Sequence, residues 1–441
     1  MRLHIGIDDT DSKKGGCTTY IAALLVQELL RLDAKFTDYP NIIRLNPNIP
    51  YKTRGNAAVA LRLKIHRIMR DSVQETVLRC VEKNSRLGDR GTDPAVVLLT
   101  GNPNSHVKRT AHKALSDVVP VKQAIRTLRG SKATAVCYGT GLGLVGALAA
   151  VGQDISGDHT YEFIAYREKR NWGTTRKIDF ESVKRMDELT APSTFNNYDP
   201  AHNRILIAPH GPDPVMIGIR GESARDVLRA FRLLRLREAV ERWVIFRTNH
   251  ATDAHFSYAD GESIRINRPV KLNGTVIERP QRIAGGHVFF TLGYGSRMVR
   301  CAAFEPTGKF KEIVAMLIPG DMVTVFGGVR KTREDLPPTV NLEKMFIRRL
   351  AVETVLENPL CPNCGKHMKS AGKLQGFRCN RCRLISRGAG KHEITKNRAL
   401  LTGVYLPDKR AHRHLTKPLS RYRIENRKWS GAPPSGEWHS P

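Results

Sequence analysis

Three carboxylates occupy four consecutive positions near the N-terminus. Asp8, Asp9 and Asp11 lie in the stretch DDTD, directly after an alternating, strand-like segment at 3–7. Neighbouring carboxylates repel one another, so such a cluster needs a compensating positive charge. Mg²⁺ suits it, because proteins hold this hard ion with one or two acids together with substrate phosphates. The stretch predicts a magnesium site, and an ordinary acidic turn is the open alternative.

The acids lead into the sequence SKKGGCTTY and then into an apolar helical run at 19–32. Gly15 and Gly16 let backbone amides turn toward an anion at the start of this helix. Thr18 lies at the same place, where threonine also serves as a simple N-cap. The GxxxxGK[ST] spacing is absent, which excludes a P-loop site. The loop therefore predicts phosphate binding beside the metal.

A second loop, NPNIPYKTRGNAAV, precedes a predicted strand. Its cations Lys52 and Arg54 lie beside Gly55 and Asn56, and arginine offers a two-pronged donor to phosphate. We expect these four residues to bind ATP phosphates together with the glycines of the first loop. A solvated pair of surface charges is the alternative.

A Gly-x-Gly-x-x-Gly tract follows the strand-like residues ATAVCY, at Gly141, Gly143 and Gly146. In a dinucleotide-binding domain this tract follows the first strand, whereas here it comes late. Close packing of a helix against its neighbours explains the glycines equally well. The tract is therefore weak evidence for a dinucleotide cofactor.

Two Cys-x-x-Cys pairs, CPNC and CNRC, are separated by fourteen residues near the C-terminus. The four thiolates, Cys361, Cys364, Cys379 and Cys382, match the spacing of a zinc ribbon that holds Zn²⁺ tetrahedrally. Because all four ligand positions are filled, the predicted site is structural. Residues 361–390 contain seven Lys or Arg and no acid, which favours contact with nucleic acid.

The bulk composition supports the same kind of partner. The chain has 441 residues and a formal net charge of +30, so several domains and a polyanionic partner are expected. A merely soluble basic protein is the alternative. No run of 18 apolar residues occurs and the start of the chain does not look like a signal peptide, so we expect a cytoplasmic protein without a membrane partner.

The order of strand and helix patterns predicts a multidomain α/β and α+β protein. Alternating strands and helices fill the first third, a split βαβ pattern follows, and short strands between Gly and Pro turns come next. The predicted parts are an α/β domain at 1–158, a ferredoxin-like domain at 159–262, an OB-fold β-barrel at 263–356, a zinc ribbon at 357–388 and a basic C-terminal tail at 389–441.

The tail combines eleven Lys or Arg beyond Gly390 with aromatic residues, namely Tyr405, Tyr422, Trp429 and Trp438. Cations neutralise phosphates and aromatic rings stack on unpaired bases, so this composition suits RNA or single-stranded DNA. A solvated disordered tail is the alternative, and the two descriptions are compatible.

The motifs GIDDTDS, GGCTTY and RLNPNIPYKTRGN together resemble the archaeal agmatinylcytidine synthetases that act on an isoleucine tRNA. The likeness continues through GLVGALAAVG, YEFIAYR and RTNHATDAH, and through the OB-like and ribbon segments. The resemblance implies a kinase-like first domain, followed by ferredoxin-like, OB-fold and zinc-ribbon domains.

The family attaches agmatine to C2 of the wobble cytidine of an isoleucine tRNA. Its members use ATP and Mg²⁺ and break ATP down to AMP and phosphate. By resemblance, Asp8, Asp9 and Asp11 belong to the metal and nucleotide site, and Thr18 matches a threonine that family members autophosphorylate. The second loop, with Lys52, matches a further part of that site.

Three functions remain to be compared. The first is an ATP-dependent, carbon–nitrogen bond-forming ligase that modifies tRNA. The second is a non-catalytic RNA-binding protein in which the OB-fold and ribbon do everything and DDTD is a turn. The third is a kinase without an RNA substrate, which the charge surplus and the basic ribbon oppose.

Overall fold

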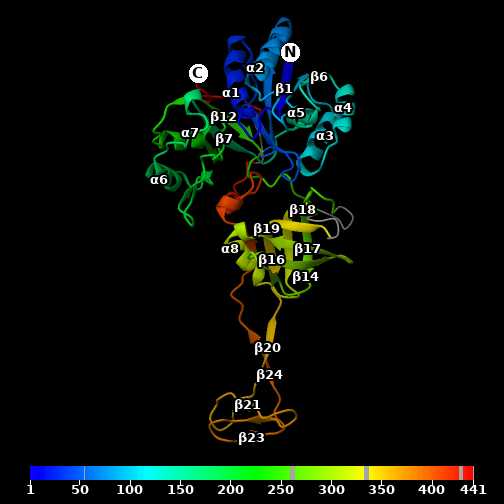
Figure 1. Cartoon of the computed structure of the whole chain (residues 1–441), viewed down its shortest axis with the longest axis vertical. Coiled ribbons are helices and arrows are strands. Elements are labelled where there is room, and N and C mark those ends of the chain that lie inside the picture. Colours follow the sequence, from blue (N-terminus) through cyan, green and yellow to red (C-terminus); the bar gives the residue numbers. More distant parts are fainter. Residues whose placement is uncertain (54, 259–263, 332–336, 427–430, 441) are drawn as a thin grey trace.

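The protein is elongated, with its parts arranged along one axis in this computed structural model (Figure 1). A large sheet with its helices forms one end, a β-barrel follows, and a small ribbon on a two-stranded stalk forms the other end. The structure describes residues 1–53, 55–258, 264–331, 337–426 and 431–440. Within these ranges, no helix has the length and apolar character needed to cross a membrane.

The N-terminal unit begins with the central strand β1. Its elements are β1 (Arg2–Asp8), α1 (Thr18–Arg31), β2 (Lys35–Phe36), β3 (Asn41–Arg44), β4 (Ala57–Lys64), α2 (Arg70–Asn84), β5 (Ala95–Thr100), α3 (Ser105–Ser116), α4 (Val121–Arg129), β6 (Ala133–Cys137) and α5 (Leu142–Gly152). The strand order is β6-β5-β1-β4-β3, and β1 runs antiparallel to both of its neighbours. Helices therefore cover a sheet whose central strand ends at the acidic stretch.

The second unit has the predicted ferredoxin-like topology. Its elements are β7 (Thr160–Arg167), α6 (Phe180–Thr190), β8 (Thr194–Phe195), β9 (Tyr198–Asp199), β10 (Arg204–Ile205), β11 (Val215–Gly221), α7 (Ala224–Arg232) and β12 (Val240–Thr248). The sheet order β12-β7-β11-β8 places the fourth, first, third and second strands side by side, as a split βαβ fold requires. The segment RILIAP contributes only the two-residue strand β10, which pairs with β9.

The two units share one sheet. Strand β12 pairs in parallel with β3, through Arg247 opposite Asn41 and Thr248 opposite Ile42. Beside this seam, the buried guanidinium of Arg247 donates from Nε to Asp38 Oδ1 at 2.9 Å. The ten-stranded sheet thus continues across the predicted boundary between 1–158 and 159–262.

The barrel that follows is a closed OB-fold, as predicted. Its elements are β13 (Ser257–Tyr258), β14 (Pro269–Val276), β15 (Gln281–Arg282), β16 (Val288–Tyr294), β17 (Arg297–Ala303), α8 (Lys309–Ala315), β18 (Met322–Arg330) and β19 (Thr339–Arg349). The order β14-β18-β19-β17-β16 closes because β16 also pairs with β14. Strands β17 and β19 pair in parallel, and α8 connects β17 to β18.

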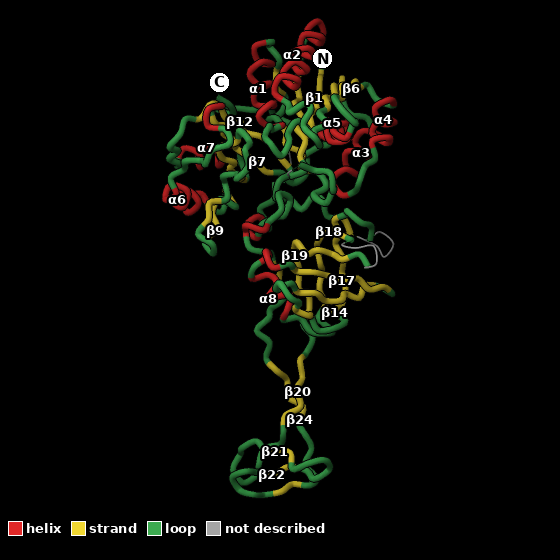
Figure 2. Tube along the Cα trace, in the orientation of Figure 1, coloured by secondary structure: helices red, strands yellow, loops and turns green. Residues whose placement is uncertain are grey.

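A two-stranded stalk carries the zinc ribbon. Strands β20 (Glu353–Glu357) and β24 (His392–Lys396) pair antiparallel, so the chain leaves and returns at the same place. Beyond them, β21 (Lys369–Ser370), β22 (Phe377–Arg378) and β23 (Ile385–Ser386) form a small sheet next to the four cysteines. Figure 2 shows that most of this end of the molecule is loop.

The alternative of a disordered tail is wrong for the described residues, because the chain after the ribbon folds back over the other domains. We call the described residues 403–426 and 431–440 the strap. Its strand β25 (Gly403–Tyr405) joins the barrel at β19, and its last residues return to the first sheet, where His439 bridges to Val244. Trp438 is buried, with its ring centroid 5.2 Å from that of Phe36.

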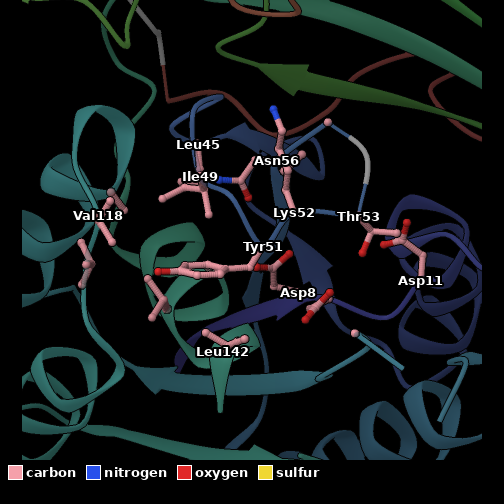
Figure 3. A pocket seen from close by; sticks show the side chains of 18 of the residues that line it. Asp8, Asp11, Leu45, Ile49, Tyr51, Lys52, Thr53, Asn56, Val118 and Leu142 are labelled. Atoms are coloured by element: carbon pink, nitrogen blue, oxygen red, sulfur yellow. The ribbon is translucent and has the colours of Figure 1, made fainter. Parts of the chain in front are cut away.

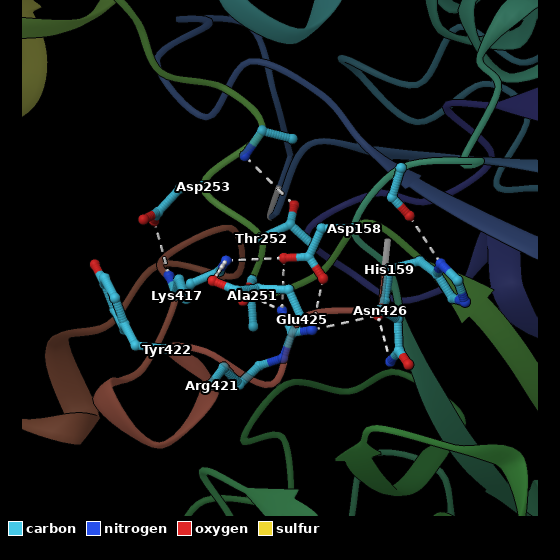
Figure 4. A network of polar contacts seen from close by, with 12 residues as sticks. Asp158, His159, Ala251, Thr252, Asp253, Lys417, Arg421, Tyr422, Glu425 and Asn426 are labelled. Atoms are coloured by element: carbon cyan, nitrogen blue, oxygen red, sulfur yellow. Dashed lines mark hydrogen bonds and ion pairs between the residues drawn. The ribbon is translucent and has the colours of Figure 1, made fainter. Parts of the chain in front are cut away.

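The strap aromatics are therefore not a free surface for stacking bases. Tyr422 lies against the ammonium of Lys344, which is 5.3 Å from its ring centroid, and the hydroxyl of Tyr405 donates to the carbonyl of Leu401. Trp429 lies outside the described residues. In Figure 4, buried Arg421 points into the sheet units, where its Nη2 donates to Asp158 at 2.8 Å.

Candidate functional site

The acidic stretch opens into a pocket at the end of β1. Asp8 is the last residue of that strand, and Asp9 and Asp11 continue along the pocket wall. The opposite wall comes from the loop after β3, through Lys52, Gly55 and Asn56. Apolar side chains complete the lining: Leu45, Ile49, Val118, Val119, Leu142 and Val145. Figure 3 shows Leu45, Ile49, Val118 and Leu142 among them. The pocket therefore offers acids, amide and cationic groups around an apolar floor.

Helix α5 fixes the position of Asp8. A Cβ atom on Gly146 would lie 1.8 Å from Oδ2 of Asp8, and one on Gly143 would lie 2.3 Å from the carbonyl oxygen of Asp93. Gly141 has a φ of 87°, in the left-handed region that favours glycine, where it begins the helix. These glycines permit close packing, as one of the two sequence interpretations expected.

Burial and mutual repulsion disfavour the charged forms of Asp8 and Asp9. Burial and the neighbouring Asp9 raise the pKa of Asp8 well above its ordinary value. Burial raises the pKa of Asp9 to about 6, although the amide of Asp93 donates to its Oδ2 at 3.1 Å. Raised carboxyl pKa values mark a place where a bound cation lowers the free energy. The oxygen donors fit a hard divalent cation such as Mg²⁺.

The three aspartates share a pocket without closing into a cage. Among the described residues, only the four ribbon cysteines bring three or more potential ligand atoms within 4.8 Å of one another. A cation at Asp8, Asp9 and Asp11 would consequently take one or two of them and complete its shell with water or substrate oxygens.

The first glycine loop lies behind Asp11 and borders a neighbouring pocket. Gly15 and Gly16 line that second pocket, together with Trp172, and have φ values of 142° and 85°. A Cβ on Gly16 would lie 3.1 Å from the Cα of Asp11. The predicted meeting of both glycine loops in one pocket is therefore not observed, although the loops are close.

Thr18 begins helix α1 close to the acids. Its side chain is buried, and its Oγ1 lies 3.0 Å from Oγ1 of Thr10. Cys17 precedes it as the N-cap residue but makes no side-chain capping bond to the helix. The threonine hydroxyl thus sits at a helix N-terminus, a place that favours a phosphate.

The side chains of the second loop, the segment between β3 and β4, do not all face the acid pocket. The amide of Asn56 donates to the carbonyl of Asn46 at 2.9 Å, which closes the loop. Lys52 lines the pocket, but its ammonium donates to the carbonyl of Pro47, and in Figure 3 its side chain extends away from Asp8. Arg54, predicted as a phosphate ligand, lies outside the described residues.

Tyr51 is a residue of the pocket that the sequence analysis missed. Its ring crosses the pocket between Ile49 and Leu142 in Figure 3, and the side chain remains 59% exposed. The signal was present, because this aromatic residue directly precedes Lys52 in the quoted loop. An exposed ring beside the apolar residues of this pocket is suited to stacking on a nucleobase.

The ribbon cysteines form the predicted metal site. Their ligand atoms lie within 4.8 Å of one another, and Sγ of Cys364 is 3.6 Å from Sγ of Cys379. Zinc–sulfur bonds of about 2.3 Å in a tetrahedron require sulfur separations of roughly 3.8 Å, so the arrangement fits Zn²⁺. The amide of Cys382 donates to Sγ of Cys379 and is the main cause that lowers its pKa to about 6, which favours the thiolate.

Comparison with known proteins agrees with this architecture part by part. A family model described as the TiaS TCKD domain matches residues 4–73, and one described as the TiaS FLD domain matches 141–255. An OB-fold nucleic acid binding domain matches 270–348, and a TiaS C-terminal zinc ribbon domain matches 358–400.

Similar proteins match over nearly their whole length. The isoleucine-tRNA 2-agmatinylcytidine synthetase TiaS of Archaeoglobus fulgidus is 40% identical, with 97% of this chain and 99% of the relative covered. The crystal structure of TiaS with its isoleucine tRNA and ATP is 39% identical with a TM-score of 0.86, and that of TiaS with the tRNA, AMPCPP and agmatine is 36% identical with a TM-score of 0.83. Each comparison covers 97% of this chain and 99% of the other. The chain belongs to the TiaS family of isoleucine-tRNA 2-agmatinylcytidine synthetases.

Proposed function

We propose that this protein is an ATP-dependent ligase that attaches agmatine to C2 of the wobble cytidine of an isoleucine tRNA. One observation carries the proposal: the acid pocket at the end of β1 belongs to a chain that matches this family over 97% of its length. ATP is broken down to AMP and phosphate in the course of the reaction. Because tRNA and ATP are its substrates, we also propose that the protein acts in the cytoplasm.

The chemistry requires activation of the C2 oxygen. A carbonyl oxygen is a poor leaving group, so an amine does not displace it directly. Transfer of the γ-phosphoryl group from ATP to this oxygen leaves ADP and makes phosphate the leaving group, and hydrolysis of the remaining anhydride bond takes ADP to AMP and a second phosphate. The primary amine of agmatine then attacks C2, the carbon–oxygen bond breaks, phosphate departs, and the amine loses its proton. The site must therefore position three reactants and balance the charge of a transferring phosphoryl group.

We assign the groups of the pocket by their chemistry. Asp8, Asp9 and Asp11 would hold Mg²⁺, which when bound offsets the charge of the ATP phosphates. Gly55 and Asn56 present backbone and amide groups to phosphate oxygens across the pocket, and Arg54 belongs to the same loop. Gly15 and Gly16 hold the turn that leads to helix α1, which places Thr18 where a phosphate is favoured.

The other domains would hold the tRNA. The OB-fold supplies a nucleic-acid-binding barrel, and the ribbon adds seven cations without an acid between 361 and 390. Chemistry on a base requires that it leave its stack, so the RNA must be held on both sides of the target. Zn²⁺ on Cys361, Cys364, Cys379 and Cys382 keeps the ribbon folded.

The direct test is incubation with a transcript of the isoleucine tRNA, ATP, Mg²⁺ and labelled agmatine. We expect label in the transcript at the wobble cytidine, and none in a matched transcript with uridine at that position. The Asp9→Asn variant should lose incorporation and magnesium-dependent ATP breakdown together. ATP breakdown in the wild type without any incorporation would contradict the proposal and favour a kinase that lacks an RNA substrate.

A further inference from the structure

Three distant parts of the chain meet beside the acid pocket. The loop after β3 contacts the barrel, where Asn46 Nδ2 donates to the carbonyl of Asn267 at 2.8 Å. Asn48 packs so closely on β18 that a Cβ atom on Gly328 would lie 2.2 Å from its Oδ1. The strap covers the same place, where Arg413 Nη1 donates to Asn48 Oδ1 at 2.9 Å. We call this place the junction.

Three cations converge at the junction, each from a different part of the chain. Arg413 comes from the strap, Arg330 from the end of β18 and Lys52 from the pocket loop. Arg330 Nη2 lies 3.5 Å from Asn48 Oδ1, the oxygen that Arg413 also contacts. The ammonium of Lys52 donates to the carbonyl of Pro47, the residue before Asn48. The cluster is thus assembled only when barrel, strap and loop are together.

Among the described residues, the acid at the junction does not balance these cations. Glu343 is buried on β19, and its Oε1 lies 3.3 Å from Nε of Arg413. Its other oxygen, Oε2, lies 3.3 Å from Nε2 of the buried His255. Burial, followed by Arg413 and Arg330, lowers the pKa of Lys52 to about 8. Cations that destabilise each other's charged forms gain free energy when an anion binds among them.

The location of the cluster identifies the anion. Lys52 belongs to the loop that lines the acid pocket, and Arg330 ends a strand of the OB-fold. An RNA strand that lies on the barrel and delivers one base to the pocket must pass the junction. Three cations on a partly exposed surface match a backbone phosphate, which carries charge at every nucleotide whatever its base.

We propose that Lys52, Arg330 and Arg413 bind a backbone phosphate of the substrate RNA next to the nucleotide whose base enters the acid pocket. This inference rests on the proposed function, because it takes RNA as the substrate. In this arrangement the strap and the barrel help to set the register of the RNA. Lys52 then binds the RNA backbone and not the phosphates of ATP.

The test removes one charge at a time. Arg330→Gln and Arg413→Gln should each weaken tRNA binding about 10- to 150-fold, because a charge-assisted contact contributes roughly 1.5–3 kcal/mol. The slope of log affinity against log salt concentration should fall by about 0.7 for each lost single-strand phosphate contact. Affinity for ATP, measured without RNA, should stay within about twofold of the wild type. Arg79→Gln, which removes an exposed charge from α2, is the matched control.

Three results would overturn the inference. An unchanged tRNA salt slope with weaker ATP binding would assign the cluster to ATP phosphates. If Arg79→Gln lost as much tRNA affinity as Arg413→Gln, the effect would come from the net charge of the protein and not from a specific phosphate contact. Arg413→Lys keeps the charge, so equal loss in the lysine and glutamine variants would reveal a purely structural role. The binding of tRNA is measured without agmatine, so this test does not depend on catalysis. If the wild type failed to incorporate agmatine, the proposed function would be contradicted but the binding test would remain valid.

Discussion

Gly146 and Asp8 approach so closely that a Cβ atom on the glycine would lie 1.8 Å from Oδ2 of the aspartate. The carboxylate is therefore held against helix α5 in the one position that this surface leaves open. Glycine at this point of the helix costs stability relative to alanine. The packing indicates that glycine is needed here, despite its cost in stability, because a larger residue would displace the Asp8 carboxylate.

Substitution of the glycine should displace the acid. We expect Gly146→Ala to reduce agmatine incorporation and magnesium-dependent ATP breakdown by at least tenfold, because the new methyl group and the Asp8 carboxylate cannot occupy the same space. Gly157→Ala is the control, since no heavy atom lies within 4 Å of a Cβ there and its φ is not positive. Equal rates for Gly146→Ala and wild type would show that the position of Asp8 is unimportant.

The acid cluster should make stability depend on pH and on magnesium. The folded pKa of Asp9 is about 6, above its ordinary 3.8, so the folded state binds more protons between these values. The free energy of unfolding should therefore decrease as pH rises from about 3.8 through 6, because the Asp9 carboxyl then loses its proton and its charged form is opposed by burial and by repulsion from Asp11. A bound cation relieves that repulsion. Mg²⁺ should raise the melting temperature clearly at pH 7.5 and much less at pH 5, whereas Asp9→Asn should flatten this difference.

Local patterns were sufficient to find the pieces of the protein. The spacing of the cysteines located the metal site, and the strand and helix order identified the ferredoxin-like and OB-fold topologies. These features depend on residues close in sequence, where periodicity and spacing carry the information. The pocket acids were found for the same reason.

Contacts between distant segments escaped those patterns. The shared sheet depends on β3, which has four residues and pairs with β12 through only two positions. The strap was mistaken for a tail because its cations look solvated in the sequence. Arg421 is instead buried against Asp158, 263 positions away. The sequence around either residue contains no pattern that predicts this pairing. The position of Lys52 at the junction was hidden in the same way.

The exposed ring of Tyr51 should stack on a nucleobase. Tyr51→Ala should weaken the binding of ATP or of tRNA by roughly 5- to 150-fold, since base–aromatic stacking contributes about 1–3 kcal/mol by alanine substitution. Tyr51→Phe keeps the ring and should bind nearly as the wild type does. Separate measurements with ATP and with tRNA identify which base uses the ring. Equal affinities of the alanine variant and the wild type for both ligands would exclude stacking.

The strap should be held mainly by its buried ion pairs. Arg421 pairs with Asp158 and Glu222, and its side chain is fully buried. Arg421→Met removes the shared cation of two carboxylates, although Asp158 keeps Lys417 and Glu222 keeps Asn426, and should cost about 3 kcal/mol in the free energy of unfolding. The matched control is Arg232→Met, because the pair of Arg232 with strap residue Glu437 is 61% and 65% exposed and should contribute less than about 1 kcal/mol. Urea unfolding measures both, and equal losses would contradict this difference.

The zinc ribbon should contribute to the binding of tRNA and not to the binding of ATP. Its removal must spare the strap, since a truncation at 361 would also delete the buried Arg421 and Trp438. The stalk offers a clean design: Glu357 pairs with His392, so 358–391 can be replaced by Asn-Gly, which favours a tight hairpin turn.

This ribbon-free protein should lose most of its affinity for the isoleucine tRNA, because the seven cations between 361 and 390 are gone, while its affinity for ATP stays the same. Zinc content measured alongside should fall to zero. The full-length Cys364→Ser variant should show a similar loss of tRNA binding, since a three-thiolate site holds Zn²⁺ less firmly. Full tRNA affinity in the ribbon-free protein would mean that the barrel and the sheet units hold the RNA by themselves.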